Sequence, residues 1–477
     1  MLDGESRLPL AEREGYIRPS LASFMLKLLE DAQTTEEQYL RHIFVRDQMA
    51  EWSKSPLIMA KAEGVHYWDV NGKHYLDALS GIYTVSVGHN NRRVIDAIKH
   101  QLDTLHFSPP MHGTNPVAVQ LANMIAEVAP GDLSTVKFEC SGSEVNEAAI
   151  KLARQYHRLT GNPGKYKVIS RYSSWHGSTL GALSASGLKS RKTVNEPMAP
   201  GFLHVFPPTC YRCPFGKTYP SCEITCATLI NDVIEMEDPA TVAAVMVEPI
   251  GHTGGIIDPP PEYLRILRDV CTRHNVMLIF DEIITGMGRT GHLFAAETFN
   301  VLPDVICTAK GLSGGFSPLS AMICRKPIAD AFWGPAATNP GFVEGHTFEG
   351  NPVSCAAGIA VLREILENDL CGNARRQGAR LRAGFERLAA KYGIIGDIRG
   401  KGLLQGIEFV KDLNTKERFP ATPGFGLQVG RRALVSGLLC RFDPHWIAFG
   451  PALNVTSEQL DEMLGLLDRC IGEVLHG

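Results

Sequence analysis

A lysine and an aspartate each stand at the end of a short apolar stretch. Asp281 closes "VMLIF", and Lys310 directly follows "DVICTA". A lysine is almost never fully buried without a partner, because the pKa of a charged group shifts towards neutrality when water is removed. One interpretation is a solvated lysine at a strand end, and the other is a reactive amine. If both stretches are parallel strands, the two side chains can face the crevice beyond the carboxyl edge of one sheet, where ligands bind.

A lysine and a carboxylate in one crevice suit the chemistry of pyridoxal 5′-phosphate. The amine can form an imine with the aldehyde of that cofactor, and the carboxylate can pair with its protonated ring nitrogen. The ring withdraws electrons effectively only when both groups are present. The pair therefore predicts amine chemistry on a bound cofactor.

Such a cofactor also needs a site for its phosphate group. The segment "FECSGSEVNEAAIKLARQYHRL" predicts a strand, a turn at Ser141, Gly142 and Ser143, and a long helix. The amides and dipole at the start of a helix favour an anion, although a Ser-Gly-Ser turn can equally be an ordinary helix cap. In "YSSWHGST", the ring of Trp175, next to His176, could lie on the face of the pyridine, although a lone tryptophan more often belongs to a core.

Two other segments resemble nucleotide-binding motifs but fit them poorly. "GMGRTG", from Gly286 to Gly291, has the spacing of a dinucleotide-binding turn, and Asp304 follows where a ribose-binding acid could lie. The stretch between them leaves little room for the second strand of that fold. "GKT", at 216–218, resembles the end of a phosphate loop, but Tyr211 stands where that loop needs a glycine. A nicotinamide dehydrogenase and an ATPase are therefore disfavoured.

Four cysteines lie close together in "CYRCPFGKTYPSCEITC". Cys210, Cys213, Cys222 and Cys226 have the spacing C-x2-C-x8-C-x3-C, which could bind zinc. The second pair has three intervening residues and the loop between the pairs is short, which favours a structural loop. We therefore predict no metal site.

The composition of the 477 residues indicates a protein that acts on small molecules. There are 47 Lys and Arg against 51 Asp and Glu, a formal charge of −4, and no run of like charges that would suit a nucleic acid or a membrane surface. The first residues, "MLDGESRLPL", lack the apolar core of a secretory signal, and no apolar run is long enough to span a bilayer. Scattered cysteines without a signal are typical of reduced thiols in the cytosol. We expect a cytoplasmic protein with no nucleic-acid and no membrane partner.

The pattern of apolar residues predicts the elements that position these groups. Residues 1–55 have helical spacing, and "HYWDVNGKHYLDAL" alternates around Asn71-Gly72, a strong hairpin signal. From about 90 to 335, helices alternate with the short apolar strands "YKVIS", "VAAVMVEP", "VMLIFDE" and "DVICTA", which indicates a mainly parallel α/β sheet. A strand pair is expected around "LLCRFDPHWIAFGP", and the last helix should begin at Thr456, whose spacing to Gln459 is that of a capping box.

Six segments together resemble the class III pyridoxal-phosphate aminotransferases, in their omega-transaminase (amine:pyruvate) branch. In order, they are "SGSEVNEAAIKLAR", "WHGSTLGALSASG", "MVEPIGHTGGIIDPPPEYLRILRDVC", "LIFDEIITGMGRTG", "PDVICTAKGLSGGFSPLSA" and "GHTFEGNPVSCAAG". The resemblance covers nearly the whole chain from about residue 45. It implies an α/β protein of fold-type I, with a large domain that holds a mainly parallel sheet and a small α+β domain built from both termini. The expected bounds are 1–55 for an N-terminal helical segment, 56–87 and 345–477 for the small domain, and 88–344 for the large, cofactor-binding domain.

The resemblance also implies which residues surround the cofactor. They are Ser141, Gly142, Ser143, Trp175, His176, Asp281, Ile283, Lys310 and Thr347. Lys310 would carry the cofactor and Asp281 would pair with its ring nitrogen, while the glycine and second serine of the turn would hold the phosphate. Trp175 and Ile283 would lie on opposite faces of the ring. Thr347 would come from the other subunit, so a homodimer would share its active sites, with a tetramer left open.

For the substrates, the resemblance implies Tyr83 and Trp175 as walls of the pocket and Arg441 as a mobile partner of the substrate carboxylate. Two departures distinguish this chain from the similar ornithine and 4-aminobutyrate enzymes, because it has Ile284 and Thr253 where those enzymes have Gln and Glu. The expected reaction moves an amino group from a primary amine or omega-amino compound to an α-keto acid, with pyruvate as the expected acceptor. A racemase or decarboxylase on the same fold remains the alternative, because the same cofactor supports those reactions.

Overall fold

The computed structural model describes residues 44–45 and 48–477. Most of the helical segment predicted for residues 1–55 therefore lies outside the described residues. The helix that is described there is α4 (Met49–Trp52). Among the described residues, no helix combines the length and the apolar character needed to cross a bilayer.

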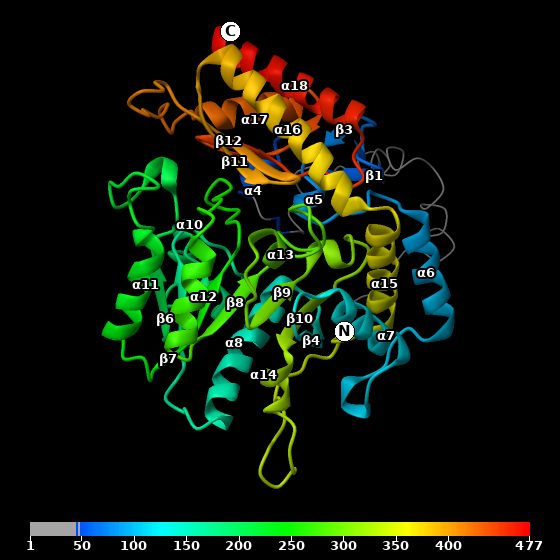
Figure 1. The fold of residues 1–477 in the computed structure, drawn as a ribbon. Coiled ribbons are helices and arrows are strands. Elements are labelled where there is room, and N and C mark those ends of the chain that lie inside the picture. Colours follow the sequence, from blue (N-terminus) through cyan, green and yellow to red (C-terminus); the bar gives the residue numbers. More distant parts are fainter. Residues whose placement is uncertain (1–43, 46–47) are drawn as a thin grey trace, which may run out of the picture.

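A seven-stranded sheet forms the centre of the molecule (Figure 1). In spatial order its strands are β4 (Leu133–Glu139), β10 (Ser320–Arg325), β9 (Val305–Thr308), β8 (Met277–Asp281), β7 (Val242–Val247), β5 (Lys167–Arg171) and β6 (Phe202–Val205). Neighbouring strands run parallel, except that β10 is antiparallel to both β4 and β9. Strand β7, "VAAVMV", is buried at every position, as expected for a strand covered on both faces. The mainly parallel sheet predicted from the sequence is confirmed.

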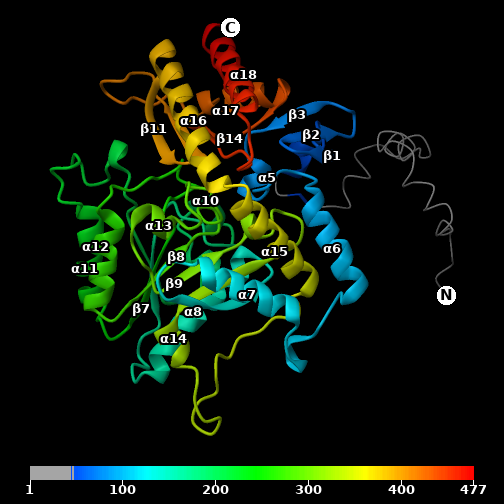
Figure 2. The same ribbon diagram turned by 45° about the vertical axis from the view of Figure 1, so that its right-hand side comes forward.

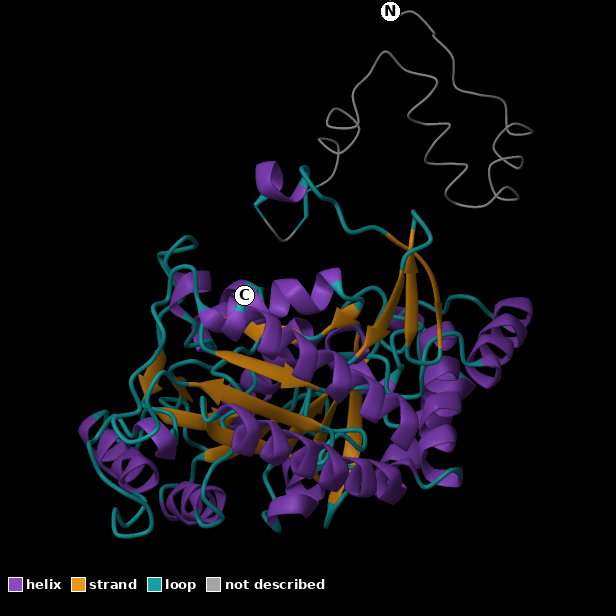
Figure 3. Ribbon diagram, turned by 90° about the horizontal axis from the view of Figure 1, so that it is seen from above, coloured by secondary structure: helices purple, strands orange, loops and turns teal. Residues whose placement is uncertain are grey.

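Helices cover both faces of this sheet (Figure 3). Because side chains alternate along a strand, Met246 and Ile279 pack towards α8 (Gly142–Leu159), whereas Val247 and Phe280 join the core on the other face. The other helices of this part of the chain are α9 (Leu180–Ala185), α10 (Lys189–Lys192), α11 (Thr225–Met236), α12 (Tyr263–Arg273), α13 (Ala295–Phe299) and α14 (Lys326–Asp330), with short 3-10 turns at Pro110–His112, Cys210–Arg212 and Lys310–Leu312.

Three further helices stand together at one end of the sheet. Helix α15 (Pro352–Glu367) packs against α6 (Arg92–Thr104) and α7 (Pro116–Val128), as Figure 2 shows. Helix α6 is capped by Asn91, whose side chain accepts a hydrogen bond from the amide of Val94.

Two four-stranded sheets above the central sheet contain elements from both ends of the chain (Figure 1). The first holds β1 (Met59–Glu63), β2 (His66–Asp69), β3 (His74–Asp77) and β13 (Leu438–Leu439), and the second holds β11 (Ile395–Lys401), β12 (Leu404–Phe409), β15 (Trp446–Phe449) and β14 (Arg441–Asp443). Helices α16 (Leu370–Tyr392), α17 (Phe425–Val435) and α18 (Ser457–His476) lie against them. Because β13 pairs with β3, the two ends of the chain share one sheet. The predicted small domain built from both termini is confirmed.

Several local signals also proved correct. Strands β2 and β3 pair antiparallel around Asn71-Gly72, and β14 pairs with β15 where the second strand pair was expected. Thr456 caps α18 and forms a capping box with Gln459.

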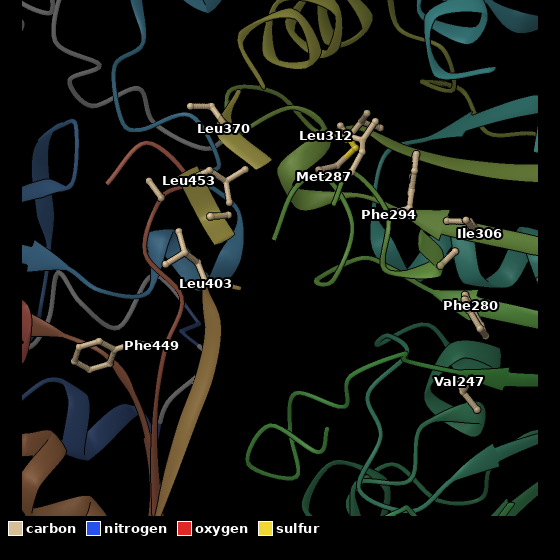
Figure 4. Close-up of a cluster of buried hydrophobic side chains, with 14 of the residues drawn as sticks. Val247, Phe280, Met287, Phe294, Ile306, Leu312, Leu370, Leu403, Phe449 and Leu453 are labelled. Carbon is tan, nitrogen blue, oxygen red and sulfur yellow. The ribbon is translucent and has the colours of Figure 1, made fainter. Parts of the chain in front are cut away.

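The largest apolar core joins the central sheet to the small domain (Figure 4). Val247, Phe280 and Ile306 project from adjacent strands of the central sheet, and Leu403 and Leu453 belong to the same cluster from the C-terminal part of the chain. The two parts of the molecule therefore bury apolar surface against each other.

Candidate functional site

A cavity of about 460 Å³ lies at the carboxyl edge of the central sheet. The strands β4, β5, β7, β8 and β9 all end there, because the residues that follow each of them contribute to its wall. Eight of the predicted site residues line it: Ser141, Gly142, Ser143, Trp175, His176, Asp281, Ile283 and Lys310. Residues far apart in the sequence thus meet where a parallel sheet binds its ligands.

The turn at the start of α8 has the form of an anion site. Ser141 is the N-cap and its hydroxyl accepts a hydrogen bond from the amide of Glu144, at 3.2 Å. Ser143 Oγ accepts a hydrogen bond from the amide of Ser178, at 2.9 Å. A Cβ atom on Gly142 would lie 2.8 Å from Ile283 Cδ1, so the backbone approaches that side chain closely. The N-terminus of α8 lines the cavity, and an anion is favoured at such a position.

The carboxylate of Asp281 is buried and fixed by three hydrogen bonds. Its Oδ2 accepts from Asn146 Nδ2 at 2.8 Å and from His176 Nδ1 at 2.7 Å, and its Oδ1 accepts from the amide of Ile283 at 3.1 Å. Asn146 also donates to the carbonyl of His176, at 2.7 Å. The charge of Asp281 adds to burial in raising the pKa of the Cys307 thiol well above its usual value. Hydrogen bonds to both of its oxygens therefore fix the position of the Asp281 carboxylate.

Two further residues of this site, Asn146 and Glu248, were not predicted from the sequence. Asn146 lies one helical turn after Ser143, and its only signal was the same-face spacing on α8. Glu248 follows β7 and lines the cavity; its carboxylate accepts hydrogen bonds from the amides of Trp175 and His252, each at 3.2 Å. Burial raises the pKa of Glu248. Its hydrogen bond fixes the backbone that carries Trp175.

Lys310 begins the turn that follows β9 and lines the cavity. Its φ of 42° lies in the left-handed region, which is uncommon for a residue with a side chain and is often found at functional sites. The next residue is held in place, because Ser86 Oγ donates a hydrogen bond to the carbonyl of Gly311 at 2.9 Å. The buried strand end thus directs a lysine into the crevice that contains Asp281.

Three predicted residues do not line this cavity. Tyr83 is buried beside it, with its ring 4.9 Å from that of His252 in an edge-on arrangement. Arg441 lies on β14, where its guanidinium stands 5.1 Å from the ring of Trp446 and 3.8 Å from the carboxylate of Asp443. Thr347 lies in the loop that precedes α15 and does not line the cavity of its own chain.

Ile284 and Thr253, the two positions at which the resemblance implies a departure, also have clear environments. Ile284 lines the cavity with an apolar side chain. Thr253 Oγ1 donates a hydrogen bond to the carbonyl of Ser173, at 2.6 Å. At neither position does the chain place a group that could pair with a substrate charge.

The rival motifs lie apart from this cavity. In "GMGRTG", the amide of Gly286 bonds back to the carbonyl of Glu282, and Arg289 is buried between the large and small domains. The four cysteines of the 210–226 loop line a separate cavity of about 20 Å³ and form no disulfide. In the described part of the chain, the only group of three or more possible metal ligands that approach within 4.8 Å of one another is Glu139, Glu344 and His346.

The chain is similar in sequence to a known family and to several of its members. Residues 48–471 match the family model described as aminotransferase class-III. A probable aminotransferase of Mycobacterium tuberculosis is 41% identical over 81% of this chain and 82% of its own length. A leucine/methionine racemase of Thermococcus litoralis is 36% identical over 93% of this chain and 96% of its own, and a taurine–pyruvate aminotransferase of Bilophila wadsworthia is 34% identical over 92% and 96%.

Solved structures agree in fold. The crystal structure of an (S)-enantioselective omega-transaminase from Thermomicrobium roseum matches with a TM-score of 0.86 and 33% identity, covering 91% of this chain and 96% of that one. The fold-type I architecture expected from the sequence is therefore confirmed.

Proposed function

The chain belongs to the class-III aminotransferases, which depend on pyridoxal 5′-phosphate, and from this membership we propose that it transfers an amino group from a primary amine or omega-amino compound to pyruvate. The observation that carries the proposal is one cavity in which Lys310, the fixed Asp281 and the helix-start turn at 141–143 meet. These are the three groups that amine chemistry on this cofactor requires.

The residues of the cavity fit this cofactor. A carboxylate offers about four acceptor positions, and three of those on Asp281 are used by Asn146, His176 and the amide of Ile283. One position on Oδ1 remains for the protonated nitrogen of the cofactor ring. Because His176 donates from Nδ1, its proton is fixed on that atom, and His176 holds Asp281 without competing for the ring. The start of α8 would hold the phosphate.

When bound, the cofactor withdraws electrons from the carbon that carries the amino group. Lys310 would hold the aldehyde carbon of the cofactor through Nζ and, once displaced by the substrate amine, would move a proton at the reacting carbon. Trp175 and Ile283 line the cavity from different elements and would hold the ring between them. Glu248 keeps Trp175 in position through its hydrogen bond to the Trp175 amide.

The apolar side chain of Ile284 in the cavity wall supports a donor without a carboxylate. Ile284 lines the cavity, and Thr253 is occupied by its bond to Ser173. In the same structure Arg441 lies outside, stacked near Trp446 and close to Asp443. When a carboxylate acceptor such as pyruvate binds, we expect the guanidinium to move into the cavity, because a guanidinium can form two hydrogen bonds to a carboxylate. The similarity to an enzyme named taurine–pyruvate aminotransferase supports pyruvate as the acceptor.

A panel of amine donors with pyruvate tests this proposal. We expect alanine and the carbonyl product of the donor to form in equal amounts, and we expect neither with the Lys310→Ala protein. Formation of no alanine from any primary amine would contradict the choice of pyruvate. If another keto acid then accepted the amino group, the reaction type would stand and the acceptor would be wrong.

A second candidate is racemisation of an amino acid, which the similarity to the leucine/methionine racemase favours. A racemase returns the proton to the same carbon from the other face, and its amino group stays on the substrate. Conversion of L-leucine to D-leucine without any keto acid, and with no alanine in the panel, would favour this candidate.

We further propose a homodimer with shared active sites, in the cytoplasm. Thr347 lies outside the cavity of its own chain, and its neighbour Phe348 is 59% exposed, while Trp333 nearby in sequence is 82% exposed. Large exposed apolar side chains of this kind are typical of interfaces. All twelve cysteines are free, which fits a reducing compartment.

A further inference from the structure

The chain forms a left-handed turn beside the cavity. The four residues Ser80–Tyr83, labelled α5 in Figure 1, have φ values of 45°, 55°, 62° and 61°. The amides of Tyr83 and Thr84 bond to the carbonyls of Leu79 and Ser80, so this is one hydrogen-bonded turn of a left-handed helix. Gly81 adopts this conformation freely, whereas the other three have side chains and Ile82 is β-branched, so the turn is strained.

The turn determines where part of the cavity wall lies. Thr84, directly after it, lines the cavity together with Gly315, and its Cγ2 is 3.2 Å from where a Cβ on Gly315 would stand. Two residues later, Ser86 donates its hydrogen bond to Gly311, next to Lys310. If the turn relaxed to a right-handed form, Thr84 and the support for the lysine would both shift.

Asp77 holds the turn from one side. It is 2% exposed, and its Oδ1 accepts from the amide of Leu79 at 3.1 Å while its Oδ2 accepts from the amide of Gly81 at 2.8 Å. His89 Nε2 lies 2.9 Å from the same Oδ2 and orients the carboxylate. A left-handed turn is thus capped by a buried side chain at the end of β3.

Arg289 holds the turn from the other side. Its Nη2 donates to Ser80 Oγ at 3.1 Å, and its Nη1 donates to the carbonyls of Leu403, at 3.3 Å, and Pro451. The guanidinium stands 6.0 Å from the ring of Tyr83. Ser80 Oγ in turn donates to the carbonyl of Gly450, at 2.6 Å.

This arginine has an unusual environment. It is 2% exposed, and none of the described carboxylates lies within 4.0 Å of it. Burial lowers its pKa to about 10. Burying a cation whose partners are only carbonyls and a hydroxyl costs free energy. We therefore expect Arg289 to have a specific role at this position.

We propose that Asp77 and Arg289 are positioning residues for the cavity wall at Thr84, because they hold Ser80–Tyr83 in its left-handed form. A strained segment persists only where its surroundings determine it from several directions, and these two residues approach the turn from opposite domains. The inference rests on the proposed aminotransferase function only for its effect on substrates.

The test compares Asp77→Asn with Asp69→Asn in the holoenzyme. An asparagine at 77 can accept at one atom only, so it loses the bond to Leu79 or the bond to Gly81. Asp69 is a matched control, because it is also buried, lies in the same sheet and accepts from the amides of Asn71 and Lys73, but belongs to a turn that does not line the cavity. Ser80→Ala tests the contact with Arg289 without removing the buried cation.

The first readout is amide hydrogen exchange of residues 78–86, which does not depend on activity. Asp77→Asn and Ser80→Ala should each accelerate exchange there by about tenfold, since one net hydrogen bond is lost, and cofactor absorbance should be retained. Asp69→Asn keeps the Oδ1 atom that accepts from both of its amides, and it should leave exchange at 78–86 unchanged. Unchanged exchange at 78–86 in both test variants would overturn the proposal, whatever reaction the enzyme catalyses.

The second readout is the ratio of kcat/KM for a bulky and a small amine. We expect this ratio to change about tenfold in Asp77→Asn and to stay unchanged in Asp69→Asn. In Asp77→Asn the change should lie mainly in KM and not in kcat. An equal change in both variants would mean that only the stability of the sheet matters, and would also overturn the proposal. If the wild-type enzyme transferred no amino group, the exchange data would still decide whether the turn is held as proposed.

Discussion

At the scale of single residues, the site depends on a few groups whose positions are determined by their partners. Asp281 is the clearest example, since Asn146, His176 and the amide of Ile283 all donate to it. The lysine is positioned differently, by a left-handed backbone at the end of β9. These arrangements give two separate predictions.

Asp281→Asn should slow turnover by on the order of 100- to 1000-fold, the range lost when one preorganised electrostatic group is removed. The cofactor should remain bound, because its phosphate would still be held at the start of α8. Stopped-flow kinetics and cofactor titration measure the two effects separately. Asp304→Asn, at the opposite edge of the sheet where Asp304 pairs with Arg268, is the matched control. Equal losses of rate and of cofactor affinity would show that Asp281 is structural.

Arg441→Ala should raise the KM for pyruvate by on the order of 10- to 1000-fold, the range of one or two charge-assisted hydrogen bonds. The KM for an aromatic or long-chain amine should change little, because the guanidinium already lies outside the cavity near Asp443. Steady-state kinetics with each substrate varied in turn measure this. Arg432→Ala serves as the control, since Arg432 is half-exposed and pairs with Glu473 on α18. Equal effects on both substrates would show that Arg441 supports the fold instead.

At the scale of elements, the 210–226 loop brings Cys210, Cys213, Cys222 and Cys226 to one small cavity. Burial, with the neighbouring thiols, raises the pKa of Cys226 to about 12. Among the described residues, no three of these sulfur atoms lie within 4.8 Å of one another, so the loop is not arranged as a metal site and we expect no stoichiometric zinc. Elemental analysis of protein purified without an affinity tag checks this. One zinc per chain, lost on Cys213→Ser, would prove the expectation wrong.

The elements also show what the sequence could predict. Strands β5, β7, β8 and β9, the hairpin at Asn71-Gly72 and the cap at Thr456 followed local rules, because a short apolar run or a capping box depends on neighbouring residues only. The left-handed turn at Ser80–Tyr83 could not be predicted, because Ile82 and Tyr83 avoid that conformation unless distant groups such as Arg289 hold it. Asn146 was missed for a related reason, since it lies on α8 and its partner Asp281 lies on β8, and only the fold brings them together.

At the scale of the whole molecule, the small domain closes over the cavity edge of the central sheet, and β13 pairs with β3 to join the two ends of the chain. Pairing across this distance in sequence is not encoded in any local pattern. The position of Thr347 outside its own cavity leads to a prediction about the assembly.

Thr347→Ala should weaken cofactor retention in the neighbouring subunit, because the hydroxyl would bind the phosphate there. Hybrid dimers that combine Thr347→Ala with Lys310→Ala chains test this. The Lys310→Ala chain is expected to retain less cofactor beside a Thr347→Ala partner than beside a wild-type one. Equal retention in both hybrids, or a protein that sediments as a monomer, would contradict the shared site.

The most direct test of the central claim is to locate the covalent attachment of the cofactor. The purified protein is reduced with borohydride in the presence of pyridoxal 5′-phosphate, digested and mapped by mass spectrometry, with Lys326→Ala, an exposed lysine paired with Asp330, as the control. We predict a single adduct on Lys310 in the wild-type and control proteins, and a folded but inactive Lys310→Ala protein without it. An adduct on a different lysine, or transfer activity that survives in Lys310→Ala, would contradict the assignment.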